Sequence, residues 1–306
     1  MRTPFNERAT EMGLEYNAGK LMASYSDQFG EVVYRQLTTM PGMESHPTDA
    51  QVAPIQAIYT RPSDNPEAEF KYCGFVSDIY QFIGNEVLNQ SIRQAIAQVG
   101  LPIVRESVIR SDNLTRMRNE IIIESSQSVP HVGDVLPVMI VENSYDGSKA
   151  AMVTFGITTR VNNERIVFAF GLGSMRQVHI VNASTQMASA ISEYMEVFSS
   201  DIANMVSGSF ESTITEEQML GTLDLIEKIG KKRREEVSKL LADMNPPAVE
   251  GQDPPLPSAW QMFLAIVRYS SLEENLNAKR LMENAAESVL VIPQRMFQVL
   301  DRLQSQ

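Results

Sequence analysis

The residues best suited to chemistry are five cationic or titratable side chains in the middle of the chain: Lys149, Arg160, Arg165, Arg176 and His179. A guanidinium group binds phosphate through two parallel hydrogen bonds, and a lysine adds a compact positive charge. Residues 100–180 hold eight Lys and Arg and eight Asp and Glu, whereas the whole chain holds 26 and 38 and has a net charge of −12. Contact with the phosphates of a nucleic acid is therefore one interpretation of these five residues. A neutral sheet wrapped by acidic helices would explain the same charge distribution.

A polar turn motif lies just before most of these cations. Its members are Asn143, Ser144, Asp146, Gly147 and Ser148. Asp-Gly is a strong hairpin signal, because both residues tolerate positive φ. The motif separates apolar runs at 135–141 and 150–157, and a third run follows at 165–172. This pattern predicts a three-stranded antiparallel meander within residues 132–182, with the turn positioning the cations.

The rest of the chain predicts an α+β protein whose sheet core is packed with helices and is followed by a helical C-terminal region. We expect an N-terminal arm at 1–50, an α+β core at 51–244 and C-terminal helices at 258–306. Residues 245–257 contain five prolines, which indicates a stiff loop. Pro54 would make the strand at 51–60 an edge strand.

Helical periodicity dominates after Ser184, where apolar residues recur every three to four positions. Two helix starts carry a capping box, in which a hydroxyl residue is followed three positions later by glutamine. These pairs are Thr215 with Gln218 and Ser258 with Gln261.

Catalytic, metal and cofactor sites are not predicted. None of the three histidines has a partner at zinc-ligand spacing. A Ser144–His179–Asp146 catalytic set can be drawn, but spacing alone provides no geometry. The single cysteine, Cys73, forms no intramolecular disulfide, which fits a reducing cytoplasm. We found no signal-peptide core and no apolar run of membrane-spanning length, so we expect a cytoplasmic protein without a membrane partner.

Several of these segments together resemble a known family. Gly133-Asp134, the turn motif at 143–148, the arginine-bearing strand pair, and Arg176 with His179 are similar to motifs of the phage- and plasmid-encoded family catalogued as domain of unknown function 932. The segment at 258–263 resembles the start of its C-terminal helix. The chain departs from the family at Tyr145, where histidine is usual, and at 166–170, which lacks the family's Cys-x-Asn pair.

The resemblance implies a binding function and no established reaction. The family is distantly similar to single-strand annealing proteins of the RecT and Red-beta type, which form rings or filaments. We therefore expect a phage or mobile-element protein that forms a homo-oligomer, binds single-stranded DNA for annealing or recombination, and is not an enzyme. The alternative is an acidic protein-interaction module, such as an inhibitor of a host-defence enzyme or an assembly factor, because an acidic surface can bind a basic partner or mimic DNA.

Overall fold

The structure is a computed structural model and describes most of the chain. The described residues are 21–27, 30–39, 51–61, 65, 67–77, 83–110, 116–130, 132–145, 151–161, 164–177, 183–244 and 255–304.

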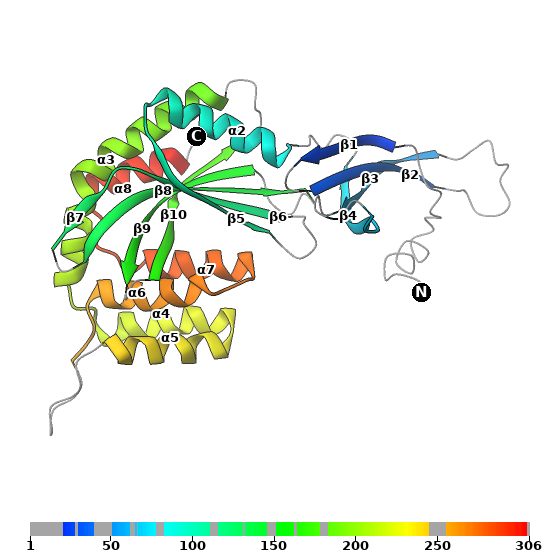
Figure 1. The fold of residues 1–306 in the computed structure, drawn as a ribbon. Coiled ribbons are helices and arrows are strands. Elements are labelled where there is room, and N and C mark those ends of the chain that lie inside the picture. Colours follow the sequence, from blue (N-terminus) through cyan, green and yellow to red (C-terminus); the bar gives the residue numbers. More distant parts are fainter. Residues whose placement is uncertain are drawn as a thin grey trace. The chain divides into compact units, whose positions relative to one another are not determined.

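The chain divides into two compact units (Figure 1). The first contains Met1–Gln90, Ile109–Met117 and Asn143–Ala151. The second contains Ser91–Val108, Arg118–Glu142 and Met152–Gln306. The C-terminal helices, which we predicted as a separate region after residue 257, thus belong to the same unit as most of the large sheet.

The first unit is built on a four-stranded antiparallel sheet. Its strands are β1 (Leu21–Asp27), β2 (Gly30–Thr39), β3 (Gln51–Arg61) and β4 (Lys71–Ser77), and they pair in sequence order. Two strands therefore lie inside the segment predicted as an N-terminal arm. The strand with Pro54 is an inner strand instead of the predicted edge strand. Its proline is accommodated because the β2–β3 ladder shifts register between Gln36 and Thr38.

The second unit contains most of a six-stranded sheet with the order β10-β9-β8-β6-β5. The strands are β5 (Ile103–Arg110), β6 (Arg116–Ile123), β8 (Gly133–Ser144), β9 (Ala151–Val161) and β10 (Glu164–Gln177), and the short β7 (Gln127–Val129) pairs with β8. β8, β9 and β10 are neighbours, and β8 pairs with β9 in antiparallel register. The fold is α+β with a helical C-terminal region, as predicted.

Helices complete the fold. They are α2 (Asn85–Gln98), α3 (Ala183–Glu211), α4 (Glu216–Ile229), α5 (Lys231–Met244), α6 (Ala259–Ser271), α7 (Leu276–Glu287) and α8 (Gln294–Gln304). Both predicted capping boxes are present. In Figure 1, α3 and α8 lie above the large sheet, α6 and α7 lie below it, and α4 and α5 lie beyond them. None of the described helices meets the length and apolarity needed to cross a membrane.

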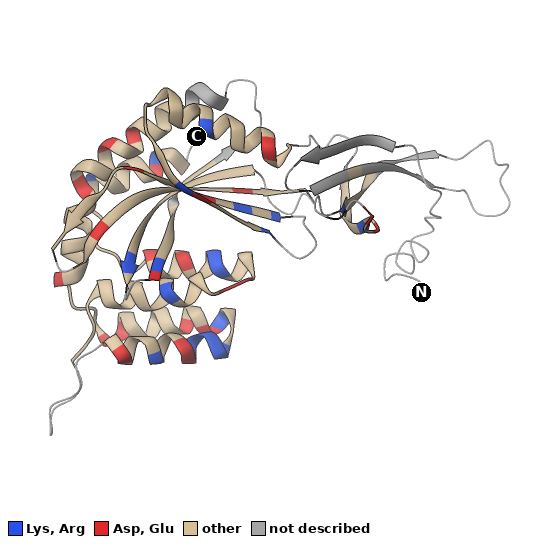
Figure 2. Ribbon diagram, viewed as in Figure 1, with Lys and Arg blue, Asp and Glu red and all other residues tan. Residues whose placement is uncertain are grey.

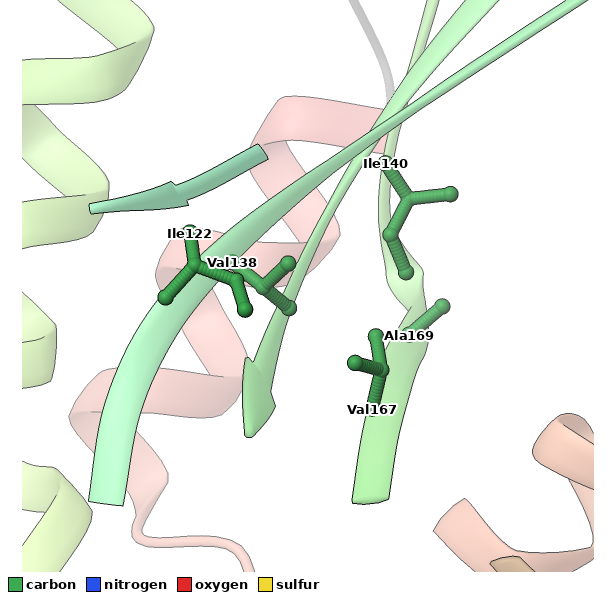
Figure 3. Packing of buried hydrophobic residues seen from close by; sticks show 5 residues of the cluster. All are labelled: Ile122, Val138, Ile140, Val167 and Ala169. Carbon is green, nitrogen blue, oxygen red and sulfur yellow. The ribbon is translucent and has the colours of Figure 1, made fainter. Parts of the chain in front are cut away.

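The core of the large sheet requires a glycine in β9. Ile122, Val138, Ile140, Val167 and Ala169 come from β6, β8 and β10 and form one buried cluster (Figure 3). β9 lies between β8 and β10 but contributes no side chain to this cluster. At Gly156, which pairs with Val138, a Cβ atom would lie 1.9 Å from the carbonyl oxygen of Phe168. Only glycine allows β10 to approach β9 this closely.

A salt bridge ties α2 to the edge of the same sheet. The Arg93 guanidinium donates to both carboxylate oxygens of Glu106 on β5, at 3.1 and 2.7 Å. The Asn119 amide of β6 donates to the same carboxylate at 2.5 Å. Burial alone would raise the pKa of Glu106, but Arg93 and Asn119 more than offset it, so the pKa lies below its ordinary value.

Gly156→Ala should destabilise the protein by about 3 kcal/mol or more, because the added methyl group collides with backbone that cannot move without breaking the ladder. Urea unfolding measures this loss. Gly221→Ala is the matched control, since its Cβ would meet nothing within 4 Å and alanine favours the α4 helix. The prediction fails if both variants retain wild-type stability.

The Glu106 interaction should make stability pH-dependent in a defined direction. A carboxyl group with a lowered folded-state pKa stabilises the fold above its ordinary pKa, and this contribution is lost as the pH falls through the lowered value. Wild type should therefore be more stable than Glu106→Gln near neutral pH, and this difference should shrink below about pH 4. Urea unfolding of both proteins across this range measures it. A constant difference would contradict the assignment.

Candidate nucleic-acid interface

Arg165 of β10 has two like-charged neighbours within range of its charge, Arg160 of β9 and Arg105 of β5, and we call these three residues the arginine cluster. Figure 2 shows basic segments at the adjoining ends of β9 and β10, where Arg160 and Arg165 lie on either side of the strand connection. The pKa of Arg165 is lowered by burial and then by the positive charges of Arg160 and Arg105. These neighbours act on Arg165 only because they lie within range of its charge.

Arg165 is the most confined member of the cluster. Its side chain is half-buried, and its Nη1 atom is fully buried without a hydrogen-bond partner. A buried donor without a partner costs roughly 1–3 kcal/mol, and more when it is charged. An anion beside the partly exposed guanidinium would reduce the repulsion from Arg105 and Arg160.

Carboxylates form salt bridges with many other described arginines but with none of the arginine cluster. Within the described ranges, no salt bridge joins Arg105, Arg160 or Arg165 to another residue. Glu164 is the immediate neighbour of Arg165, yet it pairs with Arg268 of α6 at 3.2 Å. Eight described arginines elsewhere form salt bridges: Arg93, Arg118, Arg233, Arg234, Arg268, Arg280, Arg295 and Arg302. Figure 2 shows acidic and basic segments interspersed along α4 and α5.

The structure brings together two of the predicted phosphate ligands, Arg160 and Arg165. Arg176 lies in β10, but its side chain is outside the described part of the structure, as are Lys149 and His179. The sequence analysis missed Arg105. Its signal was weak, because an exposed arginine in a polar strand is common. The strand order also separates β5 from β9 and β10, and only the effect of Arg105 on the charge of Arg165 relates them.

The described half of the turn motif has a structural role. The Asn143 amide donates to the carbonyl of Ile83 at 2.8 Å and to the Asn85 side chain at 2.9 Å. The backbone N–H of Asn85 donates to the Tyr145 hydroxyl at 3.1 Å. Asn143, Ser144 and Tyr145 are buried, and the hydrogen bonds of Asn143 and Tyr145 hold the start of α2. Asp146, Gly147 and Ser148 lie outside the described residues, so a role for them in positioning a ligand stays a prediction.

A second group of charges is buried between the large sheet and α7, and we call it the buried ion network. Arg118 of β6 donates two hydrogen bonds to Glu283 of α7, at 3.0 and 2.6 Å, and one to Glu120 at 2.9 Å. Arg280 of α7 donates to Glu142 of β8 at 2.5 Å and to Ser174 of β10 at 3.0 Å. The Arg118 side chain is only 1% exposed.

The charges of this network neutralise one another. Arg118, Lys279 and Arg280 face Glu120, Glu142 and Glu283, with Lys279 3.8 Å from Glu120. Burial alone would lower the pKa of Arg118, but the three carboxylates, led by Glu283, more than offset it and raise the pKa. Since these cations are already paired, the network joins helix to sheet and is a poor ligand site. Nothing in the sequence pattern identified it.

No metal site accompanies either group of charges in the described ranges, where no three His, Cys, Asp or Glu side chains are placed to hold an ion.

Comparison with known proteins does not identify a family for this chain: no family model, no curated protein and no solved structure matches it.

Arg118→Met should destabilise the protein by about 3–5 kcal/mol, because it leaves Glu283 buried without its directly bonded cation. Urea unfolding at neutral pH measures the change. Arg295→Met removes the same charge from an exposed pair with Glu196, in which the side chains are 53% and 72% exposed, and should change stability by less than about 1 kcal/mol. Equal losses in the two variants would contradict a special role for Arg118.

Proposed function

We propose that this protein binds single-stranded DNA through the arginine cluster, without catalysis, and that a homo-oligomer presents the strand for annealing. The observation that carries the proposal is the cluster itself: three arginines from three strands, two of them within range of the charge of the third, have no carboxylate partners among the described residues, in a chain with a net charge of −12. Such a group attracts phosphate, because it gains the counter-charge that the fold does not supply.

A single strand suits this surface better than a duplex. Reading duplex DNA commonly requires a helix with free cations and side chains that reach base edges. The described helices present mainly paired cations, such as Arg234 with Asp224 and Lys239 with Glu236. Arginines on a sheet instead suit a positively charged groove, which can follow the flexible backbone of a single nucleic-acid strand. The phage or mobile-element setting, the annealing role and the oligomer rest on the family resemblance described above.

The counterion effect provides a direct test. Binding of a fluorescent single-stranded oligonucleotide, followed by anisotropy across salt concentrations, should weaken steeply as salt rises. Arg160→Gln and Arg165→Gln should each lower the affinity and reduce the slope of log K against log salt by about 0.7, because each removes one phosphate contact.

Arg295→Gln is the matched control, since it removes an arginine charge from a surface pair with Glu196 outside the cluster. It should leave the salt slope unchanged. An absence of salt-sensitive binding by the wild-type protein at low ionic strength would contradict the proposal. Equal effects of all three substitutions on the affinity and the salt slope would also contradict it.

The net charge of −12 favours one second candidate, an acidic module that binds a basic protein. A stoichiometric partner captured from host lysate, together with no oligonucleotide binding, would support this alternative over the first proposal.

A further inference from the structure

The large sheet ends at β5, where another strand can be added. β5 is the last strand in the order β10-β9-β8-β6-β5, and no described strand pairs with its outer side. At the opposite edge, α7 takes up a backbone donor, because the N–H of Gly171 on β10 donates to the Glu287 carboxylate at 2.6 Å. An edge strand presents unpaired N–H and C=O groups, which are complementary to those of another strand.

The side chains of β5 favour such pairing. Val104, Glu106 and Val108 alternate along the strand and therefore share one face. Val104 is 49% and Val108 36% exposed, and Ile103 on the other face is 38% exposed. Branched apolar residues of this kind suit the surface of a sheet, and an exposed edge that carries them is a site for strand addition.

The sequence of β5 is suited to pairing with itself. Residues 103–109 read Ile-Val-Arg-Glu-Ser-Val-Ile, so the same apolar residues lie on both sides of Glu106. Two copies can pair antiparallel about a twofold axis at Glu106. Val104 of one copy then lies opposite Val108 of the other, and Arg105 lies opposite Ser107. Both exposed valines gain an apolar neighbour in this register.

Other registers fit less well. A register shifted by one residue would set side chains of opposite faces against each other. An axis at Arg105 would place this arginine opposite its own copy, and like charges directly opposite destabilise a pair. An axis at Ser107 would place Val108 opposite Glu106. With the axis at Glu106 the two carboxylates face each other, but Arg93 already neutralises each one through hydrogen bonds of 3.1 and 2.7 Å.

We infer that β5 pairs antiparallel with β5 of a second copy of this chain, with Glu106 at the twofold axis. This inference rests on the homo-oligomer of the proposed function and assigns its interface. Because Arg105 belongs to β5, the pairing would join the arginine clusters of two subunits through one continuous sheet. One DNA strand would then have phosphate ligands on both subunits.

Sedimentation velocity of the full chain tests this interface. Wild type should sediment with the mass of two chains of 34.2 kDa each. Val104→Lys and Val108→Lys should each raise the dissociation constant of the dimer by about tenfold or more, because a lysine on an edge strand opposes pairing. Leu281→Lys is the matched control: it changes a residue of α7 that is 53% exposed, and it should leave the dimer unchanged. Circular dichroism verifies that each variant is folded.

Disulfide cross-linking tests the register. In a chain with Cys73→Ser, the double variant Val104→Cys/Val108→Cys should form a covalent dimer on oxidation, because opposite residues of an antiparallel pair lie within the reach of a disulfide. Val104→Cys alone should form none, since the two copies of residue 104 would be about 13 Å apart along the strands. Non-reducing electrophoresis distinguishes these products.

The outcomes separate the interface from DNA binding. Wild type that sediments as a single chain, or lysine variants that dimerise like wild type, would overturn the β5 interface, while salt-sensitive binding of the oligonucleotide would still support the arginine cluster. A β5 dimer without salt-sensitive oligonucleotide binding would overturn the proposed function and leave the interface standing. Cross-linking of the single variant as efficiently as the double variant would overturn the register centred on Glu106.

Discussion

The buried charge of Arg118 is the constraint on which the second unit depends. A guanidinium group that is 1% exposed is tolerated only when carboxylates surround it, because removing an ion from water costs several kcal/mol. Its main partner, Glu283, lies 165 residues later in the chain. The strand that carries Arg118 is therefore neutralised only when α7 is in place, and the C-terminal helices are part of the sheet's own fold.

The same residue type has the opposite environment in the arginine cluster. Arg118 is more deeply buried than Arg165, yet its donors are satisfied and its pKa is raised. Arg165 has a buried nitrogen without a partner, like-charged neighbours and a lowered pKa. Among the described residues, carboxylates therefore pair with the arginines that join α7 to the sheet, but they form no salt bridge with the arginine cluster. This contrast, more than the number of arginines, distinguishes a structural charge from a candidate binding charge.

The proposed phosphate-binding surface is a local feature of an acidic molecule. With a net charge of −12, the long-range field of the chain repels nucleic acid, so binding depends on local groups. Phosphate contacts proposed for the arginine cluster would be screened by salt.

The sequence by itself determined the local features. Apolar periodicity and turn residues predicted the meander and the long helices, and the residues of both capping boxes were evident from their spacing, because these features depend on neighbours within a few positions. The sequence also singled out Arg160 and Arg165, which lie close together because a short connection joins their strands.

Only the tertiary structure decided which distant residues meet. β1 and β2 become strands inside the predicted arm because β2 pairs with β3 and β1 pairs with β2. Pro54 is accepted in an inner strand because the ladder shifts register beside it. Glu283 neutralises Arg118 through a contact between segments far apart in the chain. Such pairings are set by sheet order and helix packing, which no local pattern of residues encodes.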